Sequence, residues 1–286
     1  MSIRLCIING YPKPNREVLT RAGMCGADEL YVRVLKKLVP DARLETLFIA
    51  DLETPLLTAR QVEAYDGFIW TGSNLTIYED DPRVRRQIEF SRLLFEVGRP
   101  QFGSCWGVQM AAVAAGGEVR KNPRGREMGF ARKLRLTVEG RTHPMYEGKP
   151  DVFDGFISHL DEVTRLPDGG VLLATNEHTW VQALEVRHRN GVFWATQYHP
   201  EYELADMARL IVARADYLIK EGFFADRATL DAKVQRMEVL ASDPNRKDLR
   251  WDLAVGDDIL EDRTRQCELR NWVQKVVMPA APAGKH

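Results

Sequence analysis

The sequence lacks the features that would place it at a membrane or on a nucleic acid. It has no apolar run of the roughly 18 residues that a transmembrane helix requires, and its amino terminus lacks the charged and apolar regions of a signal peptide. Its 40 Lys and Arg residues are balanced by 41 Asp and Glu residues, so no basic excess favours binding to phosphates. We therefore expect neither a membrane nor a nucleic acid as a partner.

Cysteines are few and widely separated. The four cysteines, Cys6, Cys25, Cys105 and Cys267, form no Cys-x-x-Cys pair. This spacing fits neither a disulfide framework nor a zinc site. We expect a cytoplasmic protein that uses no metal or other cofactor, in which at least one cysteine is reactive.

The first part of the chain alternates between strand and helix patterns. Of the 286 residues, 44% are hydrophobic, which is enough to bury a full core. Residues 3–9 form a continuous apolar run, as in a strand buried on both faces, and helical spacing follows at 27–38 and 82–97. The polar, proline-containing segment 10–24 is predicted as a loop. This rhythm predicts an α/β fold with a doubly wound, mostly parallel sheet flanked by helices.

The second part of the chain has a different texture. Short apolar runs separated by turn residues predict a small antiparallel layer, with strands at 133–138, 163–166, 171–175, 181–186 and 191–196. Helical patterns follow at 203–221, 227–241 and 257–276, and the last of them contains Trp272. We expect an α/β domain over 1–205, a helical extension over 206–276 that packs on it or at an interface in a homo-oligomer, and a flexible tail over 277–286.

Residues 103–107, Gly-Ser-Cys-Trp-Gly, carry the strongest local signal. A strand ends here, a helix begins, and Cys105 stands between small neighbours. A tight turn of this kind tolerates little side-chain bulk nearby, and the helix N-terminus favours a thiolate. The pattern predicts a nucleophile, although a buried structural cysteine at a strand end is an equal alternative on this segment alone.

A cysteine nucleophile needs a base, which is commonly a histidine oriented by a carboxylate. Among six histidines, His199 is the one that directly follows a strongly apolar strand and precedes an acid by two residues, in Gln-Tyr-His-Pro-Glu at 197–201. Pro200 restricts the backbone between His199 and Glu201. We expect His143, His178 and His188, which lie in turn-rich segments, to be solvated.

Together these motifs resemble the class I, or triad, glutamine amidotransferase family. The resemblance covers roughly residues 3–203 and includes three further segments: Thr-Gly-Ser at 71–73, Gly-Arg-Glu-Met-Gly at 125–129, and Ser-His-Leu-Asp-Glu-Val at 158–163. The last two resemble the branch that contains GMP synthetase. The resemblance implies the flavodoxin-like fold of that family and a catalytic domain over 1–205.

The resemblance also implies roles for individual residues. Cys105 would attack the glutamine side-chain amide and form a γ-glutamyl thioester, with His199 moving the proton and Glu201 orienting it. The oxyanion hole would be formed by Gly72 and Trp106. The amino-acid end of glutamine would be bound by Gln109 and by the backbone around Ser158 and His159, whose side chain we expect to be structural. Because Trp106 is bulky for its position, we expect a reshaped glutamine pocket.

Three functions remain open at this stage. The first is a glutaminase that passes ammonia to a separate synthetase or acceptor subunit, because no pyrophosphatase loop or phosphate-binding loop is found in the chain. The second is a γ-glutamyl peptidase or hydrolase that uses the same triad on a larger γ-glutamyl amide. The third is a non-catalytic regulatory or scaffold protein.

Overall fold

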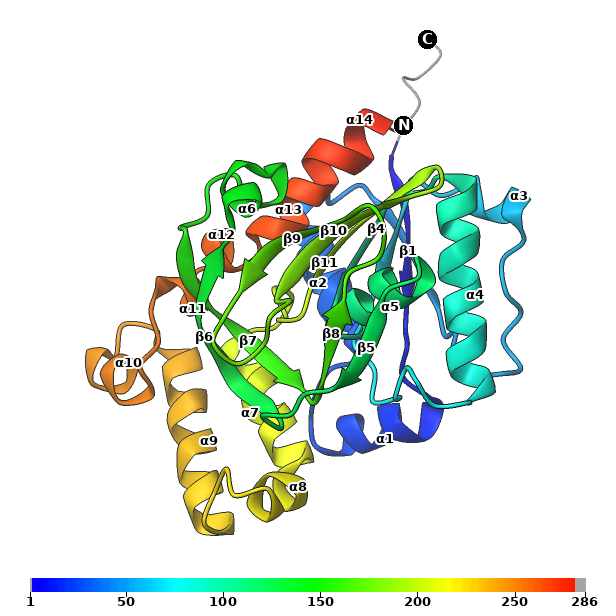
Figure 1. The fold of residues 1–286 in the computed structure, drawn as a ribbon. Helices are drawn as coiled ribbons and strands as arrows, with labels where there is room; N and C mark the ends of the chain where they lie inside the picture. The colour runs from blue at the N-terminus through cyan, green and yellow to red at the C-terminus, as the bar shows by residue number, and fades with distance from the viewer. Residues whose placement is uncertain (1, 281–286) are drawn as a thin grey trace.

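A nine-stranded mixed sheet forms the centre of the molecule (Figure 1). The computed structural model describes residues 2–280. The strand order of the sheet is β2-β1-β3-β4-β11-β10-β9-β6-β7. Its strands are β1 (Arg4–Ile8), β2 (Arg43–Leu47), β3 (Gly67–Trp70), β4 (Gln101–Ser104), β6 (Glu127–Leu136), β7 (Val152–His159), β9 (Gly170–Thr175), β10 (Ala183–His188) and β11 (Gly191–Thr196). A separate antiparallel sheet pairs β5 (Glu118–Lys121) with β8 (Asp161–Arg165).

The sheet has a parallel half and an antiparallel half. Strands β2, β1, β3, β4 and β11 are parallel to one another, whereas from β11 onward β10, β9, β6 and β7 continue the sheet in antiparallel pairs. The predicted fold class is therefore confirmed, with the addition that most of the antiparallel strands extend the main sheet. In parallel sheets of this kind, ligands bind at the carboxyl ends of the strands.

Helices cover both faces of the sheet. No helix within residues 2–280 has both the length and the apolar character that crossing a membrane would require. The helices are α1 (Lys13–Arg21), α2 (Ala27–Leu38), α3 (Ala59–Val62), α4 (Pro82–Val97), α5 (Trp106–Ala114), α6 (Val138–Thr142), α7 (Leu204–Ala213), α8 (Ala215–Lys220), α9 (Arg227–Ser242), α10 (Lys247–Leu253), α11 (Asp257–Leu260), α12 (Asp262–Arg265), α13 (Cys267–Trp272) and α14 (Met278–Ala280), with a 3₁₀ turn at Pro144–Tyr146 and a π-helical turn at Val273–Val277.

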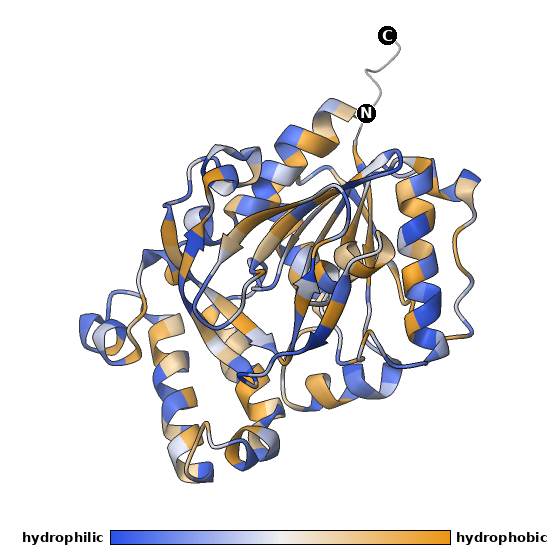
Figure 2. Ribbon diagram, viewed as in Figure 1, coloured by the Kyte–Doolittle hydropathy of each residue, from blue (hydrophilic) through white to orange (hydrophobic). Residues whose placement is uncertain are grey.

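Alternating side chains of the central strands fill two cores. In β3, Phe68 and Trp70 pack with α4 and α5 on one face, and Ile69 packs with α2 and α13 on the other. Gly67 makes room for the indole of Trp272, because a Cβ at Gly67 would lie 2.8 Å from Trp272 Cη2. Apolar residues concentrate along the strands and on the sheet-facing sides of the helices (Figure 2). This two-sided burial explains why the central strands are apolar runs.

Several predicted elements were wrong in type or extent. The segment 10–24 contains α1, whose prolines lie before and within the first turn, where a missing N–H costs nothing. The predicted helix 203–221 breaks into α7 and α8 at Arg214, and the predicted helix 257–276 breaks into α11, α12, α13 and the π-helical turn. Strands β5 and β7 were not predicted, since Asp154 and Gly155 interrupt the apolar pattern of β7. Of the predicted tail, 278–280 is helical and 281–286 lies outside the described residues.

Candidate active site

Cys105 occupies a strained turn between β4 and α5. Its φ of 53° and ψ of −92° lie in a region that residues other than glycine rarely adopt. Its backbone N–H donates to Thr196 O at 2.8 Å, which ties the turn to the end of β11. Gly103 is required here, because a Cβ at Gly103 would lie 2.8 Å from Gly107 Cα and 2.9 Å from Trp70 Cβ. The structure thus has the sharp strand-to-helix turn that the sequence predicts.

His199 and Glu201 form a buried pair beside this turn. His199 Nδ1 lies 2.7 Å from Glu201 Oε1, and each side chain is 2% exposed. The imidazole stacks on the ring of Tyr202 with 4.1 Å between the centroids and 20° between the planes. The backbone N–H of His199 donates to Phe156 O at 2.7 Å, so the strand β7 fixes the histidine backbone as well.

The environment of His199 favours its protonated form. Burial alone would lower the pKa of His199, but the Glu201 carboxylate and the Cys105 thiol next to the ring outweigh burial and raise this pKa to about 9. A histidine in this state holds a proton firmly beside the sulfur. The structure therefore brings Cys105, His199 and Glu201 together in one buried cluster.

Ser104 is a polar member of this cluster that the sequence analysis did not identify. Its Oγ donates to Glu201 Oε1 at 2.8 Å, lies 3.3 Å from His199 Nδ1, and accepts a hydrogen bond from Tyr31 OH at 2.8 Å. Ser104 precedes the candidate nucleophile in the sequence, but its bond to Glu201 exists only once β4 and β11 are neighbours. Ser104 holds the carboxylate in the orientation that faces the histidine.

The loop that follows β3 places Gly72 next to the histidine. A Cβ at Gly72 would lie 3.4 Å from His199 Cε1, so the absence of a side chain lets the backbone approach the ring. This loop is held by the loop after β1: Gly10 N–H donates to Thr71 Oγ1 at 3.1 Å, and Ser73 Oγ donates to Gly10 O at 2.8 Å. The backbone near Gly72 is thereby fixed at the edge of the pocket.

Trp106 contributes its backbone and not its side chain to this region. It is the first residue of α5, where helix N–H groups have no partner within the helix. Its indole is buried in the core and donates from Nε1 to Gln87 Oε1 on α4 at 2.9 Å. The expectation that Trp106 reshapes the pocket is wrong, because its side chain points into the core and is not part of the pocket wall.

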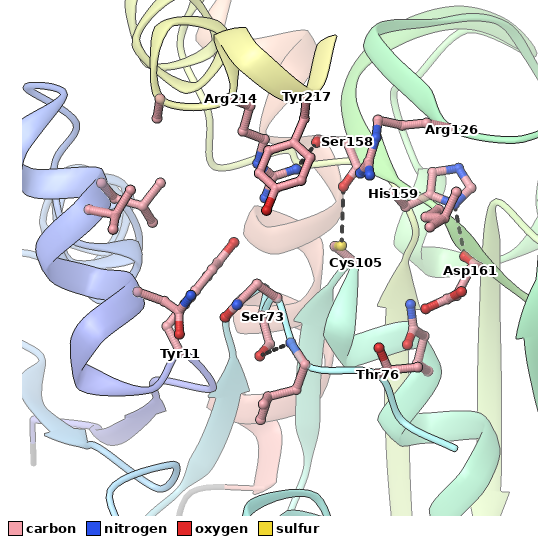
Figure 3. Close-up of a pocket in the computed structure, with 18 of the residues that line it drawn as sticks. Tyr11, Ser73, Thr76, Cys105, Arg126, Ser158, His159, Asp161, Arg214 and Tyr217 are labelled. Carbon is pink, nitrogen blue, oxygen red and sulfur yellow. Dashed lines mark hydrogen bonds between the residues drawn. The ribbon is translucent and has the colours of Figure 1, made fainter. Parts of the chain in front are cut away.

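A pocket of about 330 Å³ opens above Cys105. The predicted substrate-binding residues Gln109, Ser158 and His159 all line it. The Cys105 Sγ points to the carbonyl oxygen of Ser158 at 3.7 Å, as Figure 3 shows. The amide oxygen of Gln109 is buried and has no hydrogen-bond partner within the described chain, which leaves it free to accept from a ligand.

The ring of His159 is held by protein groups, as predicted. Its Nε2 lies 3.0 Å from Glu127 Oε2 and its Nδ1 lies 2.8 Å from Asp161 O. The prediction that the remaining histidines are solvated is wrong for His143, whose Nε2 lies 3.1 Å from Glu185 Oε2 and whose side chain is 12% exposed. Such buried contacts between distant residues cannot be inferred from turn-rich local sequence.

The pocket has two chemically different sides (Figure 3). On one side of Cys105 lie Arg126, His159 and Asp161, which present charged and polar groups. On the other side lie Tyr11 and the helix α1, and the extension adds Arg214 above the sulfur. Neither arginine was predicted at the site, nor was Tyr11. Arg126 lies within the motif at 125–129, but nothing in the local sequence indicates Arg214 or Tyr11.

The other cysteines differ from Cys105 in their surroundings. Burial raises the pKa of Cys6 to about 12 and that of Cys267 to about 11, so both remain thiols at neutral pH, whereas Cys25 is exposed. Within residues 2–280, no three His, Cys, Asp or Glu side chains gather in a way that could hold a metal ion. Cys105 is the cysteine that lines the pocket.

Comparisons with known proteins agree with this geometry. The family described as "Glutamine amidotransferase class-I" matches residues 50–215. A γ-glutamyl-L-1-hydroxyisopropylamide hydrolase from a Pseudomonas species is 36% identical over 282 residues, which cover 98% of this chain and 95% of that protein. A glutamine-hydrolysing GMP synthase from Nitrosomonas eutropha is 36% identical over 140 residues, covering 47% of this chain and 25% of the synthase.

Solved structures show the same fold. A glutamine amidotransferase from Thermotoga maritima superposes with a TM-score of 0.66 at 19% identity, covering 97% of this chain and 99% of that one. Another from Methylobacillus flagellatus gives a TM-score of 0.62 at 18% identity, covering 100% and 98%. With the family match extending over more than half of the sequence, the chain belongs to the class I glutamine amidotransferase family.

Proposed function

We propose that this member of the family hydrolyses a γ-glutamyl amide, with Cys105 as nucleophile, His199 as the proton carrier and Glu201 as the group that orients it. The observation that carries the proposal is the His199–Glu201 pair, 2.7 Å apart and buried, beside a thiol on a strained turn at the floor of the pocket. A nucleophile, a base and an orienting acid in contact are the elements of triad catalysis.

The reaction would proceed in two halves. The proton of the Cys105 thiol passes to His199, whose raised pKa favours this state, and the sulfur then attacks the γ-carbonyl carbon. As the tetrahedral intermediate collapses, the C–N bond breaks, the nitrogen takes the proton from His199 and leaves as the amine, and a γ-glutamyl thioester remains. Water, deprotonated by His199, then attacks the thioester, so glutamate is released and the thiol is restored. Backbone N–H groups near Gly72 and at Trp106 would stabilise the oxyanion in both halves.

The polar side of the pocket suits the glutamyl portion of the substrate. A γ-glutamyl group carries an ammonium and a carboxylate, which need partners of opposite charge. Asp161 and Arg126 line this side together with the free amide oxygen of Gln109, and the backbone at Ser158 and His159 forms its rim. We assign these groups to recognition of the amino-acid end, which leaves the other side of the pocket for the amine.

A substrate larger than glutamine is favoured by the extent of the Pseudomonas relative. That hydrolase matches 98% of this chain and so includes the segment 206–276, whereas the GMP synthase match covers 47% of this chain. In this protein, Arg214 and Leu218 of that segment line the pocket together with residues of α1. We therefore propose a catalytic domain over 1–205 whose pocket is completed by the helical extension over 206–276.

A second candidate function is supply of ammonia from glutamine to a separate synthetase. The relation to glutamine-hydrolysing GMP synthases favours it, since 47% of this chain matches 25% of such a synthase. The two functions share the thioester and differ in the amine that leaves. A comparison of kcat/KM for glutamine and for γ-glutamyl amides of short-chain amines separates them.

The test of the proposal is glutamate release by purified protein from glutamine and from γ-glutamyl amides. Wild-type protein should hydrolyse the amides, and Cys105→Ala should lower turnover by at least about a thousandfold. Cys25→Ala is the matched control, because Cys25 is exposed and lies outside the pocket wall. His199→Asn should lower kcat by about a hundredfold or more. Release that persists in Cys105→Ala, or its absence with every γ-glutamyl compound, contradicts the proposal.

A further inference from the structure

The wall opposite the glutamyl side is built partly from segments outside the part of the chain that matches the family. It includes Val18 and Leu19 of α1, Ala213 at the end of α7 and Leu218 of α8. The family match covers 50–215, so Val18, Leu19 and Leu218 lie beyond it, whereas Ala213 lies within it. These apolar side chains form a surface for a carbon chain, which an ammonia molecule does not need.

Tyr11 links this wall to the side of the pocket where His199 lies. Tyr11 OH and His199 Cε1 each lie 3.4 Å from the same point, a Cβ built on Gly72. The hydroxyl is therefore near the imidazole that donates the proton to the departing nitrogen. Burial raises the pKa of Tyr11 to about 12 against the lowering effect of nearby Arg214, so the phenol keeps its proton and can donate a hydrogen bond.

Arg214 brings a positive charge to this wall. It stands at the break between α7 and α8, where its φ of −112° and ψ of 16° end the first helix and turn the chain over the pocket. It donates from Nη1 to Ser158 Oγ and lines the pocket. Within residues 2–280 it forms no ion pair, whereas Arg126 is bound to Glu221 at 2.7 Å.

Several N–H donors of the Arg214 guanidinium are therefore available to a ligand. An arginine presents five N–H donors in a planar fork, and the described contacts of Arg214 use few of them. The acidic groups in the neighbourhood are engaged elsewhere: Glu221 pairs with Arg126, and Asp161 accepts from Tyr78 OH at 3.0 Å on the glutamyl side. A half-buried cation without a protein carboxylate favours an oxygen-bearing ligand and repels a cationic one.

We infer that α1 and the α7–α8 turn form an amine-side subsite that selects γ-glutamyl amides whose amine is a short carbon chain ending in a carboxylate or a hydroxyl, with Arg214 as the residue that binds this oxygen. The inference rests on the proposed function and specifies its substrate class. Amines that end in an ammonium group are excluded by the same charge.

Four compounds of nearly equal size test this selection. They are γ-glutamyl amides of alanine, alaninol, isopropylamine and 1,2-diaminopropane acylated at the nitrogen on its secondary carbon, which place a carboxylate, a hydroxymethyl, a methyl or an ammoniomethyl group at one position. For wild-type protein, kcat/KM should be highest for the carboxylate, next for the hydroxyl, about tenfold lower for the methyl compound, and lowest for the ammonium compound. In Arg214→Met, the four values should come within about threefold of one another.

Matched variants separate recognition from structural support. Arg209→Met removes an arginine of α7 that pairs with Glu238 and does not line the pocket, so it should keep the wild-type order. Arg214→Lys keeps the charge but loses the fork, so it should still discriminate against the ammonium compound. If Arg214 only holds Ser158 in place, or binds the glutamyl carboxylate, Arg214→Met lowers all four values equally, and the inference is wrong.

A binding measurement makes this test independent of catalysis. Calorimetric titration of Cys105→Ala protein with the same four compounds should give dissociation constants in the same order, and Arg214→Met in that background should remove the order. If wild-type protein hydrolyses none of them but binding follows the order, the proposed reaction fails and the subsite stands. If hydrolysis occurs without any preference for oxygen-bearing amines, the reaction stands and the subsite is refuted.

Discussion

Two of the contacts between the helical segment after Glu201 and the α/β part of the molecule differ in kind. At its start, the α7–α8 turn puts Arg214 and Leu218 into the wall of the pocket. Near its end, α13 packs Leu269 and Trp272 against the sheet. The core that they join contains Ile69 and does not contain Cys105. The comparison shows how one extension can bear on substrate choice at one end and on stability at the other.

The largest effect is expected at the α13 contact. Trp272 is fully buried, stacks obliquely on Phe102 with 5.9 Å between ring centroids, and fills the space that Gly67 leaves open. Trp272→Ala should lower the free energy of unfolding by about 3–5 kcal/mol, because it leaves a large cavity in the core. Urea denaturation measures this loss.

The same variant tests whether the two contacts act separately. Trp272→Phe is the milder control, since it keeps most of the ring and removes an indole N–H that has no hydrogen-bond partner in the described chain. In the folded fraction of both variants, the ratios of kcat/KM among γ-glutamyl amides should match those of wild type. A change in those ratios as large as that in Arg214→Met would show that the two ends of the extension are coupled.

The pocket end should respond to pH through His199. Its pKa in the folded protein is about 9, above the ordinary value of 6.5, because Glu201 and Cys105 outweigh the opposing effect of burial. A raised pKa stabilises the fold fully below the unfolded value and ceases to do so as the pH rises through about 9. Stability should therefore fall between pH 6.5 and 9.5, by up to about 3 kcal/mol.

Comparison of variants isolates this contribution. Urea midpoints at pH 6, 8 and 9.5 should converge between wild type and His199→Asn as the pH rises, while Trp272→Ala should be displaced from wild type by a constant amount. Tyrosines that titrate at high pH are present in all three proteins and cancel in the differences. Parallel curves for wild type and His199→Asn would mean that the histidine is not held in its protonated form.

The sequence predicts the parallel half of the fold because each strand and helix there has a hydrophobic pattern within its own short segment. Strands buried on both faces must be apolar throughout, and helices between them must have one apolar side, so residues 3–9 and 82–97 are recognisable without their neighbours. The α1 helix could not be predicted from such a pattern, because it lies at the surface and has few apolar positions. The break at Arg214 could not be predicted either, since both α7 and α8 have helical patterns. Tertiary contacts decide where the two helices separate.

The site divides in the same way. Cys105, His199 and Glu201 could be proposed from the sequence, because a tight strand-to-helix turn and a His-Pro-Glu segment after a strand are each recognisable from a few consecutive residues. Ser104 and Arg214 could not, because their contacts with Glu201 and Ser158 join residues that are far apart in the chain. Short motifs thus contain the residues of the proposed triad, whereas the groups that we propose to orient it and to select the amine depend on the completed fold.

The smallest effect is expected at the other tryptophan of the extension. The side chain of Trp251 in α10 is 86% exposed, whereas that of Trp272 is fully buried. Trp251→Ala should therefore change the free energy of unfolding by less than about 0.5 kcal/mol, because it removes almost no buried area and leaves no cavity. Urea denaturation beside Trp272→Ala measures both changes under the same conditions. A loss of stability at Trp251 comparable to that at Trp272 would mean that α10 is covered in solution, and light scattering on the two variants would then show whether a second copy of the chain covers it.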